Sequence, residues 1–430
     1  MTTASIASRA PARLAPLPPN AWRVIISASI GNALEWFDLV VYGFFAVTIA
    51  KLFFPNQDET VSLLLTLGTF GVSFFMRPLG ALVLGVYADR VGRKAALTLT
   101  IVLMMIGTLM IAVMPTYASI GLLAPAGIVL ARMIQGFSAG GEFGTATAFL
   151  SEQSPTRRGF FASWQVASQG ITTVLASGFG ALLTTTLSPD QMQSWGWRIP
   201  FFFGLLIGPV AYYIRTRLPE TPEFLTAETT KTPLGDTFSN QKERLLVAIG
   251  LVVLATVAAY ITLYMPTYAT RQLGIPPAAA FAATIMQGVM LFIFAPLVGS
   301  WSDRHGRTGI MLGAALLFVL LAYPAFHLLE SSPTLGTMIA VQIVIGILLA
   351  AYYGALPALL TELFPVQIRT TAMSLGYNIA VTIFGGFAPF ILTWLISATG
   401  NKLAPSFYLI FAALVSLVAL LRARGSLGMR

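Results

Sequence analysis

The stretch "GVYADRVGRK" (85–94) gathers one acid and three bases in a chain of which 10% of the residues are charged. A second stretch, "GSWSDRHGRT" (299–308), repeats its Gly, Asp, Arg, Gly and Arg at the same spacing. The matched pairs are Gly85 with Gly299, Asp89 with Asp303, Arg90 with Arg304, Gly92 with Gly306, and Arg93 with Arg307. Five matches at fixed spacing predict a chain built from two duplicated halves.

A second repeat supports the duplication. "LSEQSP" (150–155) matches "LTELFP" (360–365), so Glu152 corresponds to Glu362, and arginine follows each stretch, as Arg157 and as Arg369. Both repeats run in the same order along the chain. The halves are therefore expected to share one topology, as in transporters whose two bundles move about a central site.

Composition places the chain in a membrane. Hydrophobic residues make up 56% of 430 positions, above the roughly 45–50% of soluble domains, and the mean hydropathy is +0.80. The chain has no cysteine and two histidines, which argues against disulfides, thiolate chemistry and a zinc site. We therefore expect no metal and no bound cofactor.

Twelve apolar runs are long enough to cross about 30 Å of hydrocarbon as helices. They are 22–48, 61–86, 95–114, 119–149, 160–186, 197–216, 245–269, 279–301, 309–329, 335–361, 371–398 and 405–422. Uniform hydrophobicity favours helices over the alternating ten-residue strands of a barrel. The predicted fold class is an all-α membrane protein with twelve transmembrane helices in two six-helix bundles.

The predicted domain organisation follows from these spans. An N-terminal tail (1–21) precedes a first bundle (22–216), a proline-containing linker (217–244), a second bundle (245–422) and a short tail (423–430). An even number of spans places both tails and the linker on one side of the membrane.

Basic residues predict which side that is. Of the 25 Lys and Arg, four fall on the opposite side, namely Lys51, Arg198, Arg271 and Lys402. Arg77 and Arg132 lie inside spans, which leaves nineteen on the side of the termini. The positive-inside rule therefore places both termini in the cytoplasm, and the net charge of +9 reports orientation rather than a nucleic-acid partner.

Five ionisable residues lie within spans, where a charge is costly and is a functional candidate: Glu35, Asp38, Arg77, Arg132 and Glu142. Asn32, Glu35, Asp38 and Tyr42 recur at spacings of three and four, which predicts one helix face lining a central cavity. Two carboxylates this close repel each other, so Glu35 or Asp38 is expected to bind the coupling proton. The alternative is that both stay ionised and paired with Arg77 or Arg132.

Arg77 and Arg132 suit an anionic substrate, because a guanidinium binds a carboxylate through two parallel hydrogen bonds. The alternative is that they neutralise Glu35, Asp38 or Glu142, the last of which is expected to be a pairing or gating charge. Gln135 follows Arg132 on a similar helix face. Further polar candidates for substrate binding are Gln165, Gln169, Tyr352, Tyr377 and Asn378, each of which is individually more typical of helix packing. Glycines at 136, 140 and 144 predict close approach of another helix.

The sequence resembles the major facilitator superfamily over essentially its whole length. "GNALEWFD" (31–38), "RMIQGFSAGGEFG" (132–144) and "WGWRIPFF" (195–202) are similar to its metabolite:proton symporter branch. "FFMRPLGALVLGVYADRVGR" (74–93), "SWQVASQ" (163–169) and "IFGGFAP" (383–389) look most like citrate and tricarballylate proton symporters. The resemblance implies a monomeric importer of a small carboxylate with protons, in the lipid of a bacterial inner membrane.

The resemblance also implies a gate. In the family, the aspartate of the opening stretch meets the N-terminus of a helix in the opposite bundle, and its arginines pair with acids while the cytoplasmic side is closed. The residues that match this motif are Gly85, Asp89, Arg90, Arg93, Glu152, Asp303, Arg304, Arg307, Glu362 and Arg369.

Other functions fit less well. ATP-driven transport needs a phosphate-binding loop, and an intramembrane enzyme needs a nucleophile with a base or a metal; the sequence has neither pattern. A drug efflux antiporter is expected to carry Gly-Pro in the fifth span, where this sequence has no proline. A proline or betaine symporter shares the branch motifs, but the osmosensing member carries a long C-terminal coiled coil. Dicarboxylates such as 2-oxoglutarate, and shikimate, remain alternative substrates.

Overall fold

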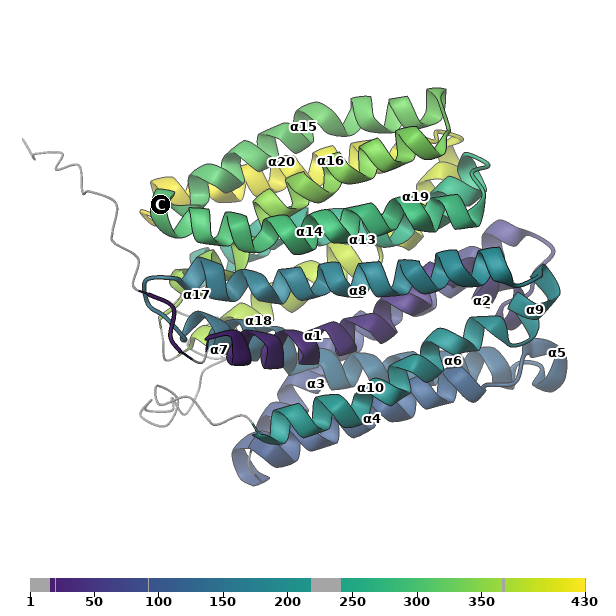
Figure 1. The fold of residues 1–430 in the computed structure, drawn as a ribbon, viewed down its shortest axis with the longest axis horizontal. Helices are drawn as coiled ribbons and strands as arrows, with labels where there is room; N and C mark the ends of the chain where they lie inside the picture. Colours follow the sequence, from purple (N-terminus) through teal and green to yellow (C-terminus); the bar gives the residue numbers. More distant parts are fainter. Residues whose placement is uncertain (1–15, 20, 92, 218–240, 366–367, 430) are drawn as a thin grey trace, which may run out of the picture.

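The computed structural model describes residues 16–19, 21–91, 93–217, 241–365 and 368–429. The regular secondary structure in these ranges is helical, with no strand, and short turns join the helices. The first half of the chain, purple to teal, forms one layer of long helices, and the second half, green to yellow, forms another (Figure 1).

The first half contains these elements: α1 Ala21–Phe44, α2 Ala46–Phe53, α3 Glu59–Val91, α4 Arg93–Val113, α5 Tyr117–Ile120, α6 Leu123–Ser138, η1 Ala139–Gly141, α7 Glu142–Ser151, α8 Arg158–Thr186, α9 Pro189–Ser194, η2 Gly196–Arg198 and α10 Ile199–Arg217. The second half contains these: α13 Lys242–Gln272, α14 Pro277–His305, α15 Arg307–Ser331, α16 Leu335–Tyr353, α17 Leu356–Leu363, α18 Arg369–Ala380, η3 Val381–Gly386, α19 Ala388–Thr399 and α20 Ala404–Gly425. Most of the predicted linker, 218–240, lies outside the described residues.

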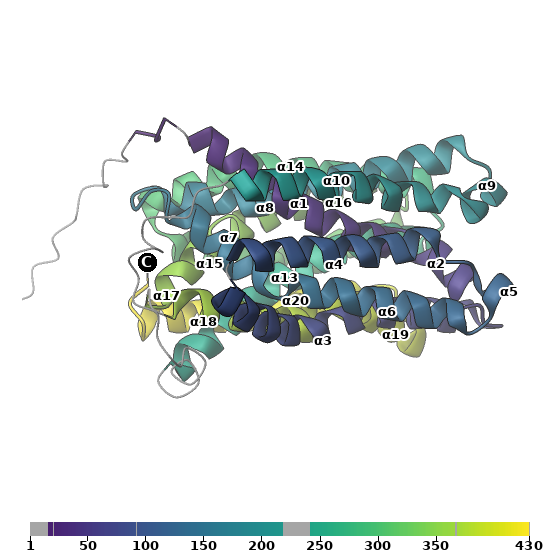
Figure 2. The ribbon, with the colours of Figure 1, turned by 90° about the horizontal axis from the view of Figure 1, so that it is seen from below.

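The helices follow the twelve predicted spans in order. In the described part of the chain, eight helical segments are long and apolar enough to cross a membrane, and the bent pair α1 and α2 makes a ninth. Shorter apolar segments in α4, α6 and α10 occupy the remaining three predicted spans. Because the number of spans is even, the start of α1 and the end of α20 lie at the same end of the molecule, which we term the terminal end (Figure 2).

Four predicted spans are interrupted rather than continuous, the tenth at residues 354–355, between α16 and α17. The first bends by 69° between Phe44 and Ala46. The fourth passes through η1, which ends at Gly141, and the eleventh passes through the π-helix η3, which ends at Gly386. Glycine costs a helix more conformational entropy than other residues, so Gly141 and Gly386 are natural places for the interruptions of the fourth and eleventh spans.

The predicted glycine stripe of the fourth span is confirmed as a packing surface. A side chain at Gly136 would overlap the backbone of Ser73 in α3, and one at Gly140 would overlap the backbone of Arg77. One at Gly144 would overlap Ser374 of α18, in the other half. The stripe therefore lets α3, and then the second half, approach closely.

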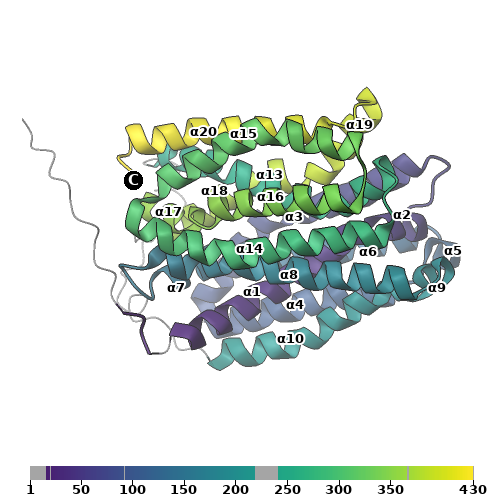
Figure 3. The ribbon, with the colours of Figure 1, turned by 45° about the horizontal axis from the view of Figure 1, so that its top comes forward.

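The two halves meet along α8 and α14, which run side by side (Figures 1 and 3). Two pairs of glycines bring their backbones together, Gly170 with Gly288 and Gly159 with Gly299. Asp303, from the second copy of the GVYADRVGRK motif, lies at this seam.

Candidate functional site

A small pocket with a cavity volume of about 40 Å³ lies between the halves. Its wall comes from α1 and α8 of the first half and from α13, α14 and α16 of the second. The polar and aromatic side chains that line it are Trp36, Phe44, Gln169, Thr172, Thr173, Tyr260, Thr262 and Gln287. Among the described residues, none of the side chains that line the pocket is charged. The buried charged side chains of the first half lie behind this wall.

Arg77 is one such charge. It lies on α3 with 4% of its surface exposed, and its guanidinium carbon is 4.5 Å from the ring centre of Phe74 and 5.8 Å from that of Trp36. Trp36 lines the pocket, so Arg77 adjoins the wall. Among the side chains that the structure describes, no carboxylate lies within ion-pair distance of Arg77. A buried cation in this setting favours an anion nearby.

Arg132, on α6, is fully buried and lies against two aromatic rings. Its guanidinium carbon is 4.6 Å from the ring centre of Tyr42 and 5.0 Å from that of Phe70. It donates hydrogen bonds to Gln135 Oε1 at 2.8 Å and to Ser73 Oγ at 3.2 Å. Arg132 and Gln135, predicted to lie on a similar helix face, thus contact each other on α6.

A chain of hydrogen bonds joins Arg132 to Asp38. Gln135 Nε2 donates to the Thr108 hydroxyl at 3.0 Å, and that hydroxyl donates to Asp38 Oδ2. The other carboxylate oxygen of Asp38 is buried and has no hydrogen-bond partner. It lies where a side chain on Gly204 of α10 would be. The carboxylate therefore occupies a space that α10 leaves open by having glycine at this position.

Sequence reasoning missed Thr108 and Gly204. Thr108 is one of many threonines in apolar spans, and Gly204 one of 38 glycines, so neither has a signal of its own. Each gains meaning from the helix that packs against it. A buried polar group needs a partner, and Thr108 is the partner that Asp38 finds.

The predicted polar face of α1 does not line the pocket. Asn32 donates to Gln165 O at 3.0 Å and to Ser168 Oγ at 2.7 Å, and Tyr42 donates to Thr66 O at 3.3 Å. Like Asp38, these side chains point into the first half, where α8, α4 and α3 supply their partners. The part of the pocket wall that α1 supplies is formed by Trp36, Val40 and Phe44. A substrate-binding role for Asn32 stays a prediction.

Of the other polar candidates, Gln169 lines the pocket, and its Nε2 donates to the Tyr353 hydroxyl at 3.4 Å. That hydroxyl lies 3.3 Å from the hydroxyl of Tyr377, which stacks on Phe143. Tyr377 therefore lies behind the pocket rather than in its wall.

The remaining three candidates make packing contacts. Gln165 bonds to Thr147, Tyr352 donates to Leu251 O at 2.7 Å, and Asn378 donates across the halves to Gly140 O at 3.0 Å. Their roles in substrate binding stay predictions.

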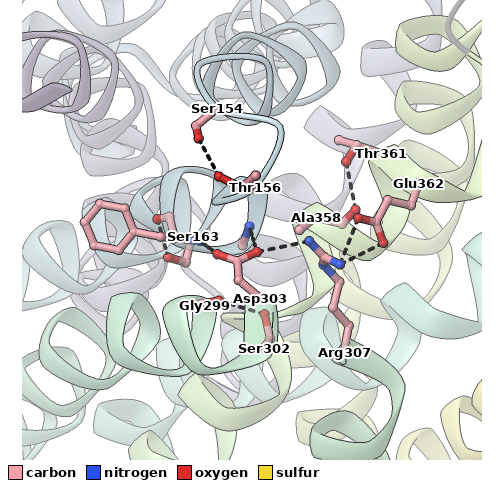
Figure 4. Close-up of polar contacts among 12 residues, drawn as sticks. Ser154, Thr156, Ser163, Gly299, Ser302, Asp303, Arg307, Ala358, Thr361 and Glu362 are labelled. Carbon is pink, nitrogen blue, oxygen red and sulfur yellow. Dashed lines mark hydrogen bonds and ion pairs between the residues drawn. The ribbon is translucent and has the colours of Figure 1, made fainter. Parts of the chain in front are cut away.

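The second copy of the repeated motif forms a charge cluster at the terminal end (Figure 4). Asp303 accepts hydrogen bonds from the backbone N–H of Gly159, at 2.7 Å, and of Phe160, at 2.9 Å. These are residues of the first turn of α8, where the helix dipole favours an anion. Arg307 donates to Asp303 at 3.1 Å and lies 2.8 Å from Glu362 Oε1. The cluster thus ties α14, α15 and α17 of the second half to α8 of the first.

The structure describes the side chains of three other predicted gate residues. Arg304 is exposed, Glu152 is partly buried and Arg369 is buried at the start of α18. Outside the described side chains lie Gly85, Asp89, Arg90, Arg93, Glu35 and Glu142. The first copy of the motif and two of the three candidate proton carriers therefore have no structural account.

No group of three or more metal-ligating side chains occurs in the part of the chain that the structure describes. The arrangement is instead one of buried charges behind a neutral pocket, with a second set of charges bridging the halves at one end. Such a layout serves the passage and enclosure of a small polar molecule.

Comparison with known proteins gives the same class. Residues 24–235 match the sequence profile described as "Sugar (and other) transporter", and residues 272–426 match "Major Facilitator Superfamily". A "Citrate-proton symporter" of Salmonella typhi is 41% identical over 400 residues, covering 92% of each chain. A "Proline/betaine transporter" of Escherichia coli is 38% identical, covering 92% of this chain and 82% of the other.

Among solved structures, a D-xylose-proton symporter superposes with a TM-score of 0.73 at 18% identity, covering 92% of this chain and 97% of that one. The chain belongs to the major facilitator superfamily. The predicted fold of twelve transmembrane helices in two bundles is confirmed, and so is the prediction of a multi-pass membrane transporter rather than an enzyme.

Proposed function

We propose that the protein is a proton-coupled symporter that imports citrate or a related tricarboxylate by alternating access. The observation that carries the coupling is the hydrogen-bonded chain from Arg132 through Gln135 and Thr108 to Asp38. It connects a buried cation with a buried carboxylate across three helices. Relatives named as proton symporters support the same mechanism.

This hydrogen-bonded chain provides a means of coupling substrate binding to proton binding. A carboxylate bound by Arg132 neutralises its cation, and a proton bound by Asp38 neutralises its anion. With both ligands bound, neither Arg132 nor Asp38 carries an unpaired charge while the protein is closed on both sides. Because the two groups share hydrogen bonds, occupancy of one site biases the other, and by linkage the effect is reciprocal. Asp38 is thus the proposed carrier, while Glu35 and Glu142 remain candidates without a structural account.

Anionic substrate is supported by two buried cations of the first half, Arg77, which adjoins the pocket wall at Trp36, and Arg132, which lies against Tyr42 and Phe70. Tricarboxylate as the class is supported by the citrate-proton relative. A second candidate is a zwitterion such as proline or betaine. It is favoured by the neutral lining with Trp36 and Tyr260, whose rings suit a cationic amine, and by the proline/betaine relative.

Uptake by proteoliposomes distinguishes these candidates. We expect labelled citrate to accumulate when the outside is acidic, and to stop accumulating when an ionophore removes the proton gradient. Glycine betaine and proline are the matched alternatives. Accumulation of betaine but not citrate would overturn the proposed substrate, and citrate uptake indifferent to the proton gradient would overturn the coupling.

Substrate binding tests the role of the arginines separately. We expect Arg132→Gln to weaken citrate binding by about 100-fold or more, since it removes two charge-assisted hydrogen bonds. Isothermal titration of the purified protein measures this. Arg198→Gln, at the opposite end of the bundle, is the control and should bind as wild type does; equal losses in both would contradict a direct role.

The charge cluster of Asp303 is proposed as half of a gate. Its contacts join the two halves at the terminal end, so they must break before that end opens. The excess of basic residues supports placing this end in the cytoplasm of a bacterium. The linker 217–244, the domain boundaries and the monomeric state belong to the same proposal.

A further inference from the structure

One buried side-chain amide of the central pocket makes no hydrogen bond to the described part of the protein. Gln287 of α14 is 1% exposed and lines the pocket. Its Oε1 is buried without a hydrogen-bond partner, and its carboxamide makes no hydrogen bond to any other described residue. A buried amide left unsatisfied costs free energy unless something else binds it.

Four other polar side chains of the pocket wall make hydrogen bonds within the protein. The hydroxyls of Thr172, Thr173 and Thr262 donate to the backbone carbonyls of Ala33, Gln169 and Ala258. Gln169 donates to Tyr353. Gln287 differs from these four because its donor and its acceptor are both available.

The position of Gln287 is fixed by packing on two sides. The next residue, Gly288, brings α14 against Gly170 of α8, in the first half. On α16, Gly346 leaves room for the backbone of Gln287, which lies about where a side chain at 346 would be. The amide is therefore held at the seam between the halves, facing the pocket.

We propose that Gln287 is a substrate-binding residue of the second half, and that its carboxamide pairs with an O–H group of the substrate, either a hydroxyl or a protonated carboxyl. This rests on the proposed function and narrows it. A carboxamide offers one donor and one acceptor, and an O–H group offers the same pair in return. An ionised carboxylate only accepts, and a quaternary ammonium does neither, so both would leave the carbonyl of Gln287 unpaired.

The proposal divides recognition between the halves. The first half supplies the cations Arg77 and Arg132 for ionised carboxylates, and the second half supplies a neutral amide for a group that retains its hydrogen. A site that binds an O–H group rejects a ligand without one, because its buried polar atoms are then left unpaired.

Binding measurements on purified protein test this with two ligands. Citrate carries a hydroxyl, and tricarballylate carries the same three carboxyl groups without it. We expect Gln287→Leu to weaken citrate binding by about tenfold, the effect of one lost neutral hydrogen-bonded pair. If Gln287 binds the hydroxyl, Gln287→Leu should bind tricarballylate as wild type does. If Gln287 binds a protonated carboxyl, the variant should lose affinity for both ligands, and the loss should disappear as pH rises. Either pattern supports the proposal.

Two further variants keep the result interpretable. Gln342→Leu is the matched control, because Gln342 is a fully buried glutamine of the same half, also with an unpartnered Oε1, but outside the pocket wall. Gln287→Glu tests the pairing directly, since a protonated glutamic acid again offers a donor and an acceptor. Its citrate affinity relative to wild type should recover as pH falls, which a merely structural role would not produce.

The outcomes that overturn the proposal are distinct. Citrate binding by Gln287→Leu as tight as wild type, or an equal loss in Gln342→Leu, overturns the inference while leaving citrate symport intact. Transport of betaine but not citrate by the wild-type protein overturns the proposed function and the inference with it.

Discussion

Two aspartates of this chain have opposite surroundings. Asp303 accepts two backbone hydrogen bonds from the start of α8 and an ion pair from Arg307, and Figure 4 shows these donors converging on it. Asp38 has one hydroxyl donor, from Thr108, and a second oxygen with no partner. Donors to a carboxylate stabilise its ionised form. The comparison therefore suggests that Asp303 works as a fixed charge that holds an interface, and Asp38 as a group that changes its proton occupancy.

The largest expected effect is on coupling. Asp38→Asn keeps the shape of the side chain and its contact with Thr108 but removes the exchangeable proton. Gradient-driven accumulation of citrate in proteoliposomes should fall to the level of empty liposomes, whereas exchange of labelled for unlabelled citrate across the membrane should continue. A variant that still accumulates citrate against its gradient would remove Asp38 from the mechanism and return the role to Glu35 or Glu142.

Asp303→Asn should leave coupling intact and loosen the interface. An amide accepts through one oxygen and carries no charge, so it loses a bond to α8 and the pairing with Arg307. The chain has no cysteine, so Ser163→Cys would introduce a unique thiol beside Gly299 at the seam. We expect Asp303→Asn to speed maleimide labelling of that thiol by about tenfold, the effect of one charge-assisted hydrogen bond. Unchanged labelling would contradict a gating role for Asp303.

Sequence reasoning predicted one of these two aspartates better than the other. The partners of Asp303 belong to repeats that are visible in the sequence, since "GSWSDRHGRT" and "LTELFP" supply Arg307 and Glu362. The spans and the glycine stripe were also predictable, because they depend on the local pattern of hydrophobic and small residues.

The surroundings of Asp38 depend on the rotation of α1. Spacing correctly groups Asn32, Asp38 and Tyr42 on one side of the helix, but it does not say which neighbour that side meets. Trp36 and Val40, on another side, face the pocket instead. Thr108, Gly204 and Gln287 were missed because their importance arises from what packs against them, which one sequence does not show.

A smaller effect on transport is expected when the hydrogen-bonded chain between Arg132 and Asp38 is interrupted at Thr108. Thr108→Val removes the hydroxyl that bonds to both Gln135 and Asp38 while keeping the volume of the side chain. Citrate turnover should fall by up to about tenfold with little change in KM, since Thr108 does not line the pocket. The control is Thr66→Val, because the buried Thr66 hydroxyl bonds to the backbone of its own helix. Equal losses in both variants would mean that helix packing, not the chain, is being measured.

The smallest expected effect is at Gly204. A methyl group there would overlap Asp38 Oδ1, the oxygen without a partner, so Gly204→Ala should push the carboxylate away from α10 while leaving its charge in place. Turnover driven by the proton gradient should fall a few-fold, and citrate binding measured by titration should not change. Gly178→Ala, which has open space around it, is the matched control. If Gly204→Ala transports as fast as the control, the space beside Asp38 has no part in coupling, and the contrast with Asp303 rests on hydrogen-bond donors alone.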